Sequence, residues 1–254
     1  MNSTSNPVFV KGEEFLPFGN SFDLNLVAAV SARAQGNMSL CYGDVSNALL
    51  NRETFMEKLG INFKDLVCAK QTHSGNVRYV SELNKGKGAL TYDDAIPDTD
   101  AFITDRKGVP IAIFTADCLP VFLYDSYKPA IGLVHAGWRS TKEDIVFTAI
   151  KLMQKQFGTN PHDLLAGFGP AIRSCSFEVE EGFKKLFPKD IQERNAKLYM
   201  DLAGANKRQI LRAGVKLENI FDYRICTSCS IQDFYSFRIE KEVSGRMISV
   251  MMLR

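Results

Sequence analysis

Three polar segments each place a histidine or a cysteine beside a run of apolar residues. They are residues 70–75, which contain His73, residues 115–120, which contain Cys118, and residues 135–140, which begin with His135. Two imidazoles and a thiolate suit zinc, and catalytic zinc sites keep three protein ligands and leave the fourth position to water. The three residues are far apart in the chain, so no local knuckle joins them. From spacing alone, a turn histidine bonded to backbone and a small buried cysteine are the favoured interpretations, ahead of a shared metal site.

The third segment also has features of an anion site. Gly137 permits close backbone approach, and Arg139 supplies a bidentate hydrogen-bond donor. The following residues 140–143 read Ser-Thr-Lys-Glu, which is the pattern of a capping box, and the start of a capped helix attracts anions. We therefore expect a phosphate or another anionic group beside His135. The alternative is that Arg139 pairs with a structural carboxylate.

Four further charged residues are candidates for substrate or phosphate binding. Arg33 and Arg52 lie in polar segments near a predicted turn or helix, although Arg52 also fits a solvated helix face. Glu178 has apolar neighbours, which would raise the pKa of its carboxyl and suit acid–base work. It fits equally well as a residue in the first turn of a helix. Asp100 leaves the same choice open.

The remaining cysteine pair and the third histidine are interpreted as structural. Cys226 and Cys229 form a Cys-x-x-Cys pattern, which is typical of redox sites or of half a zinc site. The sequence has no second such pair, so we interpret this one as structural. His162 follows Asn160 and Pro161 in a predicted surface turn, where we expect a solvated side chain.

Composition excludes several classes of protein. The 254 residues carry 31 Lys and Arg against 29 Asp and Glu, and 45% of residues are hydrophobic. This excludes a disordered chain and argues against a nucleic-acid binder, which normally has a basic excess. Three histidines cannot build a large multi-histidine metal assembly. No apolar stretch is long enough to span a membrane and residues 1–17 lack a signal sequence, so we expect a cytoplasmic protein.

Hydrophobic periodicity predicts a mixed protein of the α+β (α/β) class. Strands are predicted at residues 66–70, 76–81, 101–104, 109–115, 120–124, 130–135, 223–226, 234–238 and 247–252. Helices are predicted at residues 46–59, 145–157, 178–187 and 201–213. Several strands are apolar at nearly every position, which indicates that both of their faces are covered.

The motifs carry a family resemblance over residues 21–253. The matching pieces are Lys-Gln-Thr-His at 70–73, Asp-Ala-Phe-Ile-Thr at 100–104, Thr-Ala-Asp-Cys-Leu-Pro at 115–120, His-Ala-Gly-Trp-Arg at 135–139, Gly-Pro-Ala-Ile at 169–172, Cys-Thr at 226–227, Phe-Tyr-Ser-Phe-Arg at 234–238 and Gly-Arg at 245–246. With these motifs the chain resembles the YfiH family, also labelled laccase-like or multicopper polyphenol oxidase.

The resemblance implies a fold, a metal and an activity. It implies one domain over residues 1–254, with two mixed sheets between outer helices in a four-layer α/β/β/α sandwich; residues 1–20 are an expected strand or arm. It assigns zinc to His73, Cys118 and His135. It further implies phosphorolysis of adenosine, inosine, guanosine and methylthioadenosine, and hydrolytic deamination of adenosine. Some members edit peptidoglycan precursors instead.

Three positions depart from the family pattern. One glycine of the usual Thr-Arg-x-Gly-Gly motif is replaced beside Arg33, Ser140 stands where many members have glycine, and Phe177 replaces a common tyrosine. Arg33 and Glu178 are still carried over as candidates.

The expected partners are a purine nucleoside and phosphate, with no nucleic acid or membrane; a monomer and a weak dimer both remain open. The expected catalytic residues are His73, Cys118, His135 and Arg139. Activated water would attack the purine C6 in deamination, and phosphate beside Arg139 would attack the ribose C1′ in phosphorolysis. Asp100 or Glu178 would carry the proton.

Three alternatives to the zinc nucleoside enzyme stay open. A cysteine hydrolase would use Cys118 as nucleophile, with His135 or His73 as base, and would suit the editing of peptidoglycan precursors. A copper-dependent polyphenol oxidase would use the same two histidines and cysteine, although copper is the less favoured metal. A non-catalytic, zinc-stabilised binding protein would unfold when zinc is removed.

Overall fold

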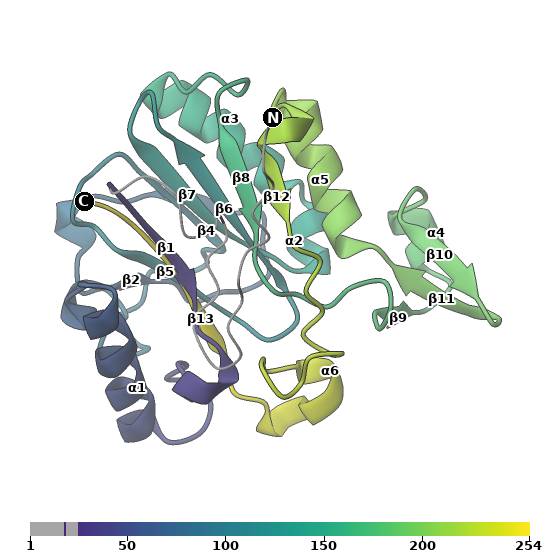
Figure 1. Cartoon of the computed structure of the whole chain (residues 1–254), viewed down its shortest axis with the longest axis horizontal. Helices are drawn as coiled ribbons and strands as arrows, with labels where there is room; N and C mark the ends of the chain where they lie inside the picture. The colour runs from purple at the N-terminus through teal and green to yellow at the C-terminus, as the bar shows by residue number, and fades with distance from the viewer. Residues whose placement is uncertain (1–17, 19–24) are drawn as a thin grey trace, which may run out of the picture.

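Two β-sheets lie face to face in the computed structural model, which describes residues 18 and 25–254 (Figure 1). The expected arm at residues 1–20 therefore lies, apart from Phe18, outside the described residues. The first sheet has the strand order β1 (Leu26–Val30), β13 (Met247–Leu253), β5 (Ile111–Thr115) and β2 (Val67–Cys68). The second has the order β12 (Ile220–Asp222), β8 (Leu165–Phe168), β6 (Leu119–Asp125), β7 (Ala130–Ala136), β4 (Ala101–Thr104) and β3 (Val77–Tyr79).

Both sheets are mixed, and helices cover their outer faces. In the first sheet β2 runs parallel to β5 while the other pairs are antiparallel, and in the second sheet only the two edge pairs are parallel. Helix α1 (Val45–Lys58) covers the first sheet, and α3 (Ile145–Phe157) and α5 (Leu202–Ala213) cover the second. The expected four-layer α/β/β/α arrangement is confirmed.

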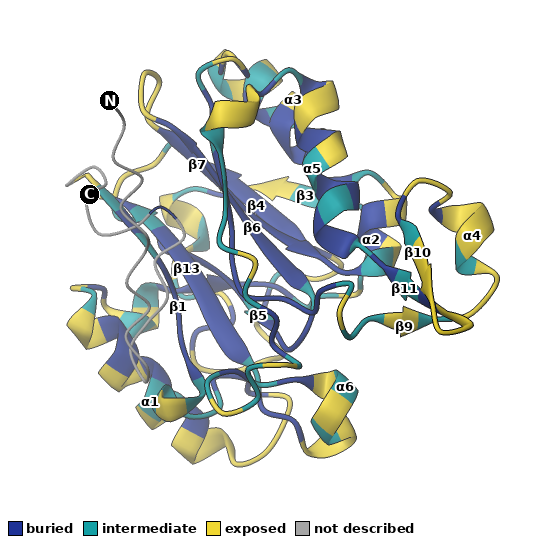
Figure 2. Ribbon diagram, turned by 45° about the vertical axis from the view of Figure 1, so that its right-hand side comes forward, coloured by how far each residue is buried: buried dark blue, intermediate teal, exposed yellow. Residues whose placement is uncertain are grey.

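Alternation along β1 shows why the layers form. Val27 packs with Phe55 and Met56 of α1, whereas Val30 faces the other way and joins Phe122 in the core between the sheets. Successive strand side chains point to opposite faces, so a strand that is apolar on both faces needs a cover on each. Figure 2 shows the result: β5, β6, β7 and β13 in the middle of the two sheets are buried, whereas the edge strand β3 is largely exposed, and α1 and α3 carry both buried and exposed residues.

A small third sheet projects from the body of the molecule on the right of Figure 1. It contains β9 (Glu178–Val179), β11 (Lys197–Met200) and β10 (Ile191–Arg194), with α4 (Phe183–Leu186) beside them. The predicted helix at residues 178–187 is therefore wrong. Residues 178–179 pair with β11 instead, and only a single helical turn forms before Pro188.

Carboxylate caps set the starts of α1 and α5. The prediction for α5 is confirmed, because the Asp201 carboxylate accepts from the Gly204 N–H and Gly214 adopts the left-handed conformation after the last turn. Helix α1 starts at Val45, one residue before the predicted start at residue 46, because the Asp44 carboxylate caps it. The capping box at residues 140–143 is wrong: these residues overlap the five-residue helix α2 (Trp138–Lys142), whose cap is Gly137.

Two predicted strands do not form. Residues 223–226 make only an isolated bridge between Cys226 and Ala171, and residues 234–238 run into the short helix α6 (Phe237–Glu240). Strands β1, β8, β10, β11 and β12 were not predicted. The β8 sequence Leu-Ala-Gly-Phe has little strand propensity, and its buried place between β6 and β12 determines its conformation. Short 3₁₀ turns occur at Arg33–Gln35, Phe63–Asp65, Glu82–Asn84, Leu217–Asn219 and Lys241–Val243.

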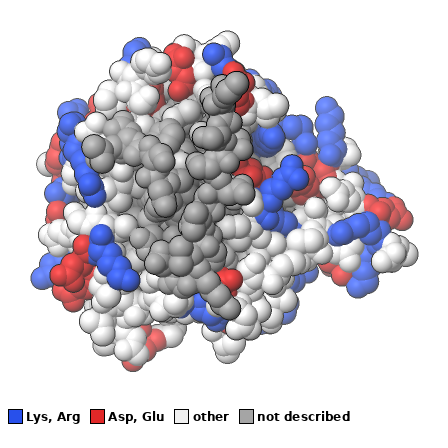
Figure 3. Space-filling model, viewed as in Figure 1, with Lys and Arg blue, Asp and Glu red and all other residues white. Residues whose placement is uncertain are grey.

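The surface carries both charges in mixture. Over the described part of the face in Figure 3, basic and acidic side chains are interspersed, in keeping with the formal net charge of +2. Among the described residues no helix is long and apolar enough to cross a membrane.

Candidate active site

The three candidate ligands come together where the chain passes between the sheets. Cys118 lies in the crossing from β5 of the first sheet to β6 of the second, His73 lies in the turn that follows β2, and His135 lies near the end of β7. The His73 Nε2 and Cys118 Sγ atoms are 3.8 Å apart, and the two imidazole centroids are 4.8 Å apart. One ligand atom from each residue lies within 4.8 Å of the others, so one ion fits between them.

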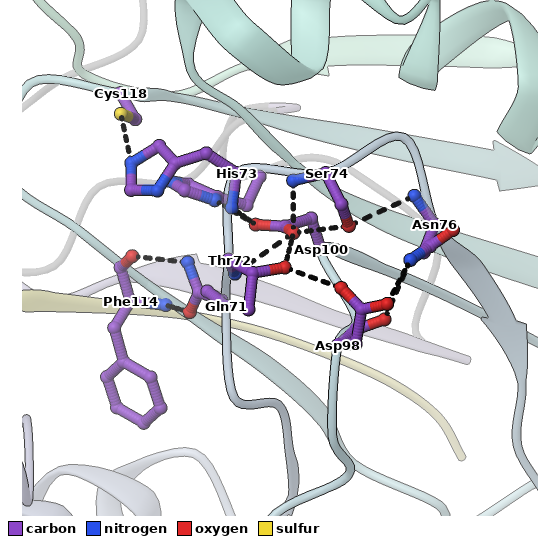
Figure 4. A network of polar contacts seen from close by, with 10 residues as sticks. Gln71, Thr72, His73, Ser74, Asn76, Asp98, Asp100, Phe114 and Cys118 are labelled. Carbon is purple, nitrogen blue, oxygen red and sulfur yellow. Dashed lines mark hydrogen bonds and ion pairs between the residues drawn. The ribbon is translucent and has the colours of Figure 1, made fainter.

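The Asp100 carboxylate bonds to two of the three candidate ligands (Figure 4). Its side chain is fully buried; Oδ1 lies 2.8 Å from His135 Nδ1 and accepts the His73 backbone N–H at 3.0 Å. Its Oδ2 accepts from the Ser74 backbone N–H at 2.7 Å and from the Ser74 hydroxyl at 2.9 Å. Because the Nδ1 atom of His135 is hydrogen-bonded to Asp100, the Nε2 atom of that ring is free to bind a metal. A carboxylate behind a ligand histidine is the usual support at zinc sites.

Two residues of the site have strained backbone conformations. His73 has φ of 60° and Asp117 has φ of 89°, in the left-handed region that side-chain-bearing residues rarely adopt. The Asp100 carboxylate holds the first turn. The second is held by Asp117 itself, whose Oδ1 accepts from the Thr227 hydroxyl at 2.6 Å and whose Oδ2 accepts from the Arg238 N–H at 2.6 Å. Strain retained in this way is a mark of functional sites.

Gly137 leaves the space that the ligands occupy. A Cβ atom at this position would lie 2.9 Å from His73 Cδ2 and 3.0 Å from Cys118 Sγ. The glycine in the His-Ala-Gly-Trp-Arg motif is thus required by close approach to the two ligands and not by its φ of −74°.

The electrostatics favour a charged thiolate. Burial alone would raise the pKa of the Cys118 thiol, but His135 and His73 outweigh it and lower the pKa to about 6. Burial would likewise lower the pKa of His135, but Cys118 and Asp100 raise it to about 9. The thiolate is the form of cysteine that binds metals and attacks carbon. A metal ion bound to the Cys118 thiolate would replace the proton that His135 otherwise holds beside that thiolate. The donor set therefore fits zinc.

A cavity of about 830 Å³ opens onto these ligands. Arg52 lines it although its side chain is only 2% exposed, which excludes a solvated helix face. Its guanidinium donates to the carbonyls of Met38, Gly88 and Ala89 and stacks over Phe114 at 4.6 Å. Among the described residues no carboxylate forms an ion pair with it. A buried charge normally requires an opposite charge, so the cavity can offer an anion a strong partner.

Arg139 lines the same cavity and stacks on Trp138, with 4.4 Å between its guanidinium carbon and the ring centroid. The cavity also has aromatic walls, formed by Tyr42, Tyr92, Phe114, Trp138, Phe177 and Phe237. Such faces suit a planar heterocycle.

The other candidates lie elsewhere. Arg33 forms an ion pair with Glu240 at 2.7 Å, and Glu178 is exposed and pairs with Lys197 at 2.9 Å. The cavity lining, as far as the described residues form it, does not include Arg33, Glu178 or Asp100. His162 is exposed in a turn, where its backbone N–H donates to the Asn160 side chain.

Sequence reasoning did not single out Gln71 and Asp117. The Gln71 side chain bonds both the N–H and the carbonyl of Phe114 and so fixes the His73 turn to β5. Gln71 shares a motif with His73, and Asp117 directly precedes Cys118. This nearness to a candidate ligand is the feature of the sequence that could have identified both residues.

The fold and the site together define a single-domain protein with two mixed sheets between helices and one His–Cys–His centre at the crossing between sheets. The chain belongs to the family described as multi-copper polyphenol oxidoreductase laccase, whose model matches residues 28–254.

Relatives in this family are named as nucleoside enzymes. The chain is 32% identical to a purine nucleoside phosphorylase YlmD from Geobacillus stearothermophilus, over 84% of this chain and 81% of that protein. It is 33% identical to an adenosine deaminase RL5 from an unknown prokaryote, over 84% and 86% of the two chains. The crystal structure of the Geobacillus YlmD superposes with a TM-score of 0.87 at 30% identity, covering 91% of this chain and 93% of that one. The chain thus belongs to a family of enzymes.

Proposed function

We propose that the protein is a zinc-dependent purine nucleoside enzyme that cleaves nucleosides with phosphate and deaminates adenosine at the same site. One observation carries the proposal: the buried Arg52 guanidinium, without a carboxylate partner among the described residues, lines the same cavity as the three ligands. The names of the relatives agree with it, since they include both activities.

Each part of the site has a separate task in this proposal. His73, Cys118 and His135 would hold the zinc ion, which supplies Lewis acidity and a bound water of lowered pKa. Arg52 and Arg139 bind the phosphate, and the aromatic walls hold the purine. Asp100 fixes the ring of His135 and the backbone of His73, so it is a positioning residue. Because Asp100 and Glu178 lie away from the cavity lining, neither is assigned a proton transfer here.

Product analysis tests the proposal directly. Zinc-loaded protein is incubated with inosine or adenosine, with and without phosphate, and free base, ribose 1-phosphate and ammonia are measured. We expect free base and ribose 1-phosphate only with phosphate present, and ammonia from adenosine in both cases. Release of neither base nor ammonia would overturn the proposal.

A cysteine hydrolase is the second candidate, because Cys118, His135 and Asp100 also form a nucleophile, a base and an orienting carboxylate. Such an enzyme would suit the editing of peptidoglycan precursors. Chelation separates the two functions: a thiol nucleophile should keep its activity without zinc, whereas the nucleoside activity should be lost. A multi-copper oxidase would need further imidazole ligands, and the chain has only His162 left.

A further inference from the structure

A second group of thiols lies outside the cavity lining described above. Cys175, in the turn between β8 and β9, comes close to Cys226 and Cys229 of the Cys-x-x-Cys turn. The Cys175 and Cys229 sulfur atoms are 3.4 Å apart, and all three sulfur atoms lie within 4.8 Å of one another. Cys226 is buried and the other two are exposed, so the group is at the surface and accessible to an ion.

The spacing agrees with tetrahedral coordination. Zinc–sulfur bonds of about 2.3 Å give sulfur–sulfur edges of about 3.8 Å in a tetrahedron, and an oxygen at its fourth corner lies about 3.5 Å from each sulfur. The Ser176 hydroxyl lies 3.7 Å from the Cys175 sulfur, 3.8 Å from that of Cys226 and 3.2 Å from that of Cys229. Three sulfurs and one oxygen therefore already approach the corners of such a site.

Backbone contacts hold the two loops in place. Ala171 and Cys226 form a bridge, with the Thr227 N–H donating to the Ala171 carbonyl at 3.1 Å. The Cys-x-x-Cys turn is closed by the Ser230 N–H, which donates to the Cys226 carbonyl at 2.9 Å.

We propose that Cys175, Cys226 and Cys229 form a second zinc site, with the Ser176 hydroxyl at the fourth corner. Binding replaces the three thiol protons, which pass to solvent. The site is structural, because its ligands come from two loops that the ion joins. It also adjoins the active site, since the Thr227 hydroxyl bonds Asp117, the neighbour of Cys118. The ion would thus hold the turn that supports the Cys118 backbone.

Zinc counting on the full chain tests the site without an activity assay. Protein is purified under a phosphine reductant with zinc supplied, and bound zinc is measured by elemental mass spectrometry. We expect two zinc ions per chain in the wild type, one in Cys175→Ser and in Cys229→Ser, and one in Cys118→Ser. Ser228→Ala, in the same turn with all thiols retained, is the matched control and should keep two.

Cobalt binding provides a second readout on the unmutated chain. Two equivalents of Co²⁺ should bind, and the sulfur-to-cobalt charge-transfer band should lose most of its intensity in Cys229→Ser and little in Cys118→Ser, since the second site has three thiolates. A single zinc per reduced chain that disappears in Cys118→Ser would overturn the proposal. So would a Cys175–Cys229 disulfide in the isolated protein with no second zinc bound after reduction. The zinc content of Cys118→Ser reports on the His73–Cys118–His135 site separately. If one of the two sites binds no zinc, the zinc content of the variants therefore still shows whether the other does.

Discussion

Arg52 shows at the scale of one residue how the site would recognise phosphate. We expect Arg52→Gln to raise the KM for phosphate in phosphorolysis by about 10- to 100-fold, because a charge-assisted hydrogen bond contributes about 1.5–3 kcal/mol. Deamination of adenosine, which uses no phosphate, should change far less. Steady-state kinetics of both reactions on one preparation make this comparison.

The matched control for Arg52 is Arg106→Gln, which removes an exposed guanidinium that follows the end of β4 and does not line the cavity, and it should affect neither reaction. Thermal unfolding of Arg52→Gln reports the loss of its three backbone contacts separately. An equal fall in both activities would count against a phosphate role for Arg52.

Asp100 acts through other residues, so its substitution should affect metal binding first. Asn cannot accept all of the N–H groups that the two Asp100 oxygens accept, because one of its atoms is itself a donor. We expect Asp100→Asn to weaken zinc binding at the His73 site by about 10- to 100-fold. Competition with a chromophoric chelator measures this affinity. Asp98→Asn, a more exposed neighbour bonded to Thr72 and Asn76, is the control and should lose less. Equal affinities for the two variants would contradict the positioning role.

At the scale of elements, the segment around α6 depends on Glu240. Its carboxylate pairs with Arg33 and accepts from the Ser236 N–H and the Ser244 hydroxyl. Burial would raise the pKa of Glu240, but these partners outweigh it and hold the pKa below its ordinary value. A lowered folded-state pKa means that the charged group stabilises the fold above the unfolded pKa, and that this contribution is lost as pH falls through the folded pKa.

We therefore expect Glu240→Gln to lower the free energy of unfolding by about 1–2 kcal/mol at pH 7, with the difference from wild type vanishing as pH falls through the lowered pKa of Glu240. Urea denaturation at a series of pH values measures it. Glu242→Gln, at an exposed position in the same segment, should show almost no change. A difference that stayed constant down to low pH would show that the charge of Glu240 is not its cause.

Local sequence predicted those elements whose ends are set by local contacts. The helix of residues 202–213 has its cap and its stop in the sequence, and β4, β6 and β7 are apolar enough to be recognised. Residues 178–179 follow no such rule, because their conformation is set by pairing with Leu198 and Tyr199, some twenty residues later in the chain. Ser140 matched a local cap pattern, yet the glycine needed beside the ligands starts the helix earlier.

At the scale of the whole molecule, the site is a product of topology. The sequence motifs identified His73, Cys118 and His135 as candidate ligands. These three residues come together because the chain crosses from one sheet to the other between β5 and β6. The approach of Cys175 to the Cys-x-x-Cys turn likewise depends on long-range packing, and no spacing rule contains it. Residue types can thus nominate ligands, whereas the fold decides which of them share an ion.

The layered core also predicts what zinc removal does to the fold. Three buried apolar clusters, one between the sheets and one under each helical layer, contain none of the three ligands and should keep the chain folded without metal. Each ion bound at 1,000 times its Kd adds about 4 kcal/mol of stability, which for a domain of this size corresponds to a Tm shift on the order of 10 °C per ion. We expect chelated protein to lose nucleoside turnover, keep its far-ultraviolet circular dichroism and melt cooperatively at that lower temperature, with full recovery on adding zinc. Calorimetry and turnover measured on the same samples check this.

Loss of the cooperative transition on chelation would instead favour a zinc-stabilised binding protein, in which the metal holds the fold and no reaction depends on it.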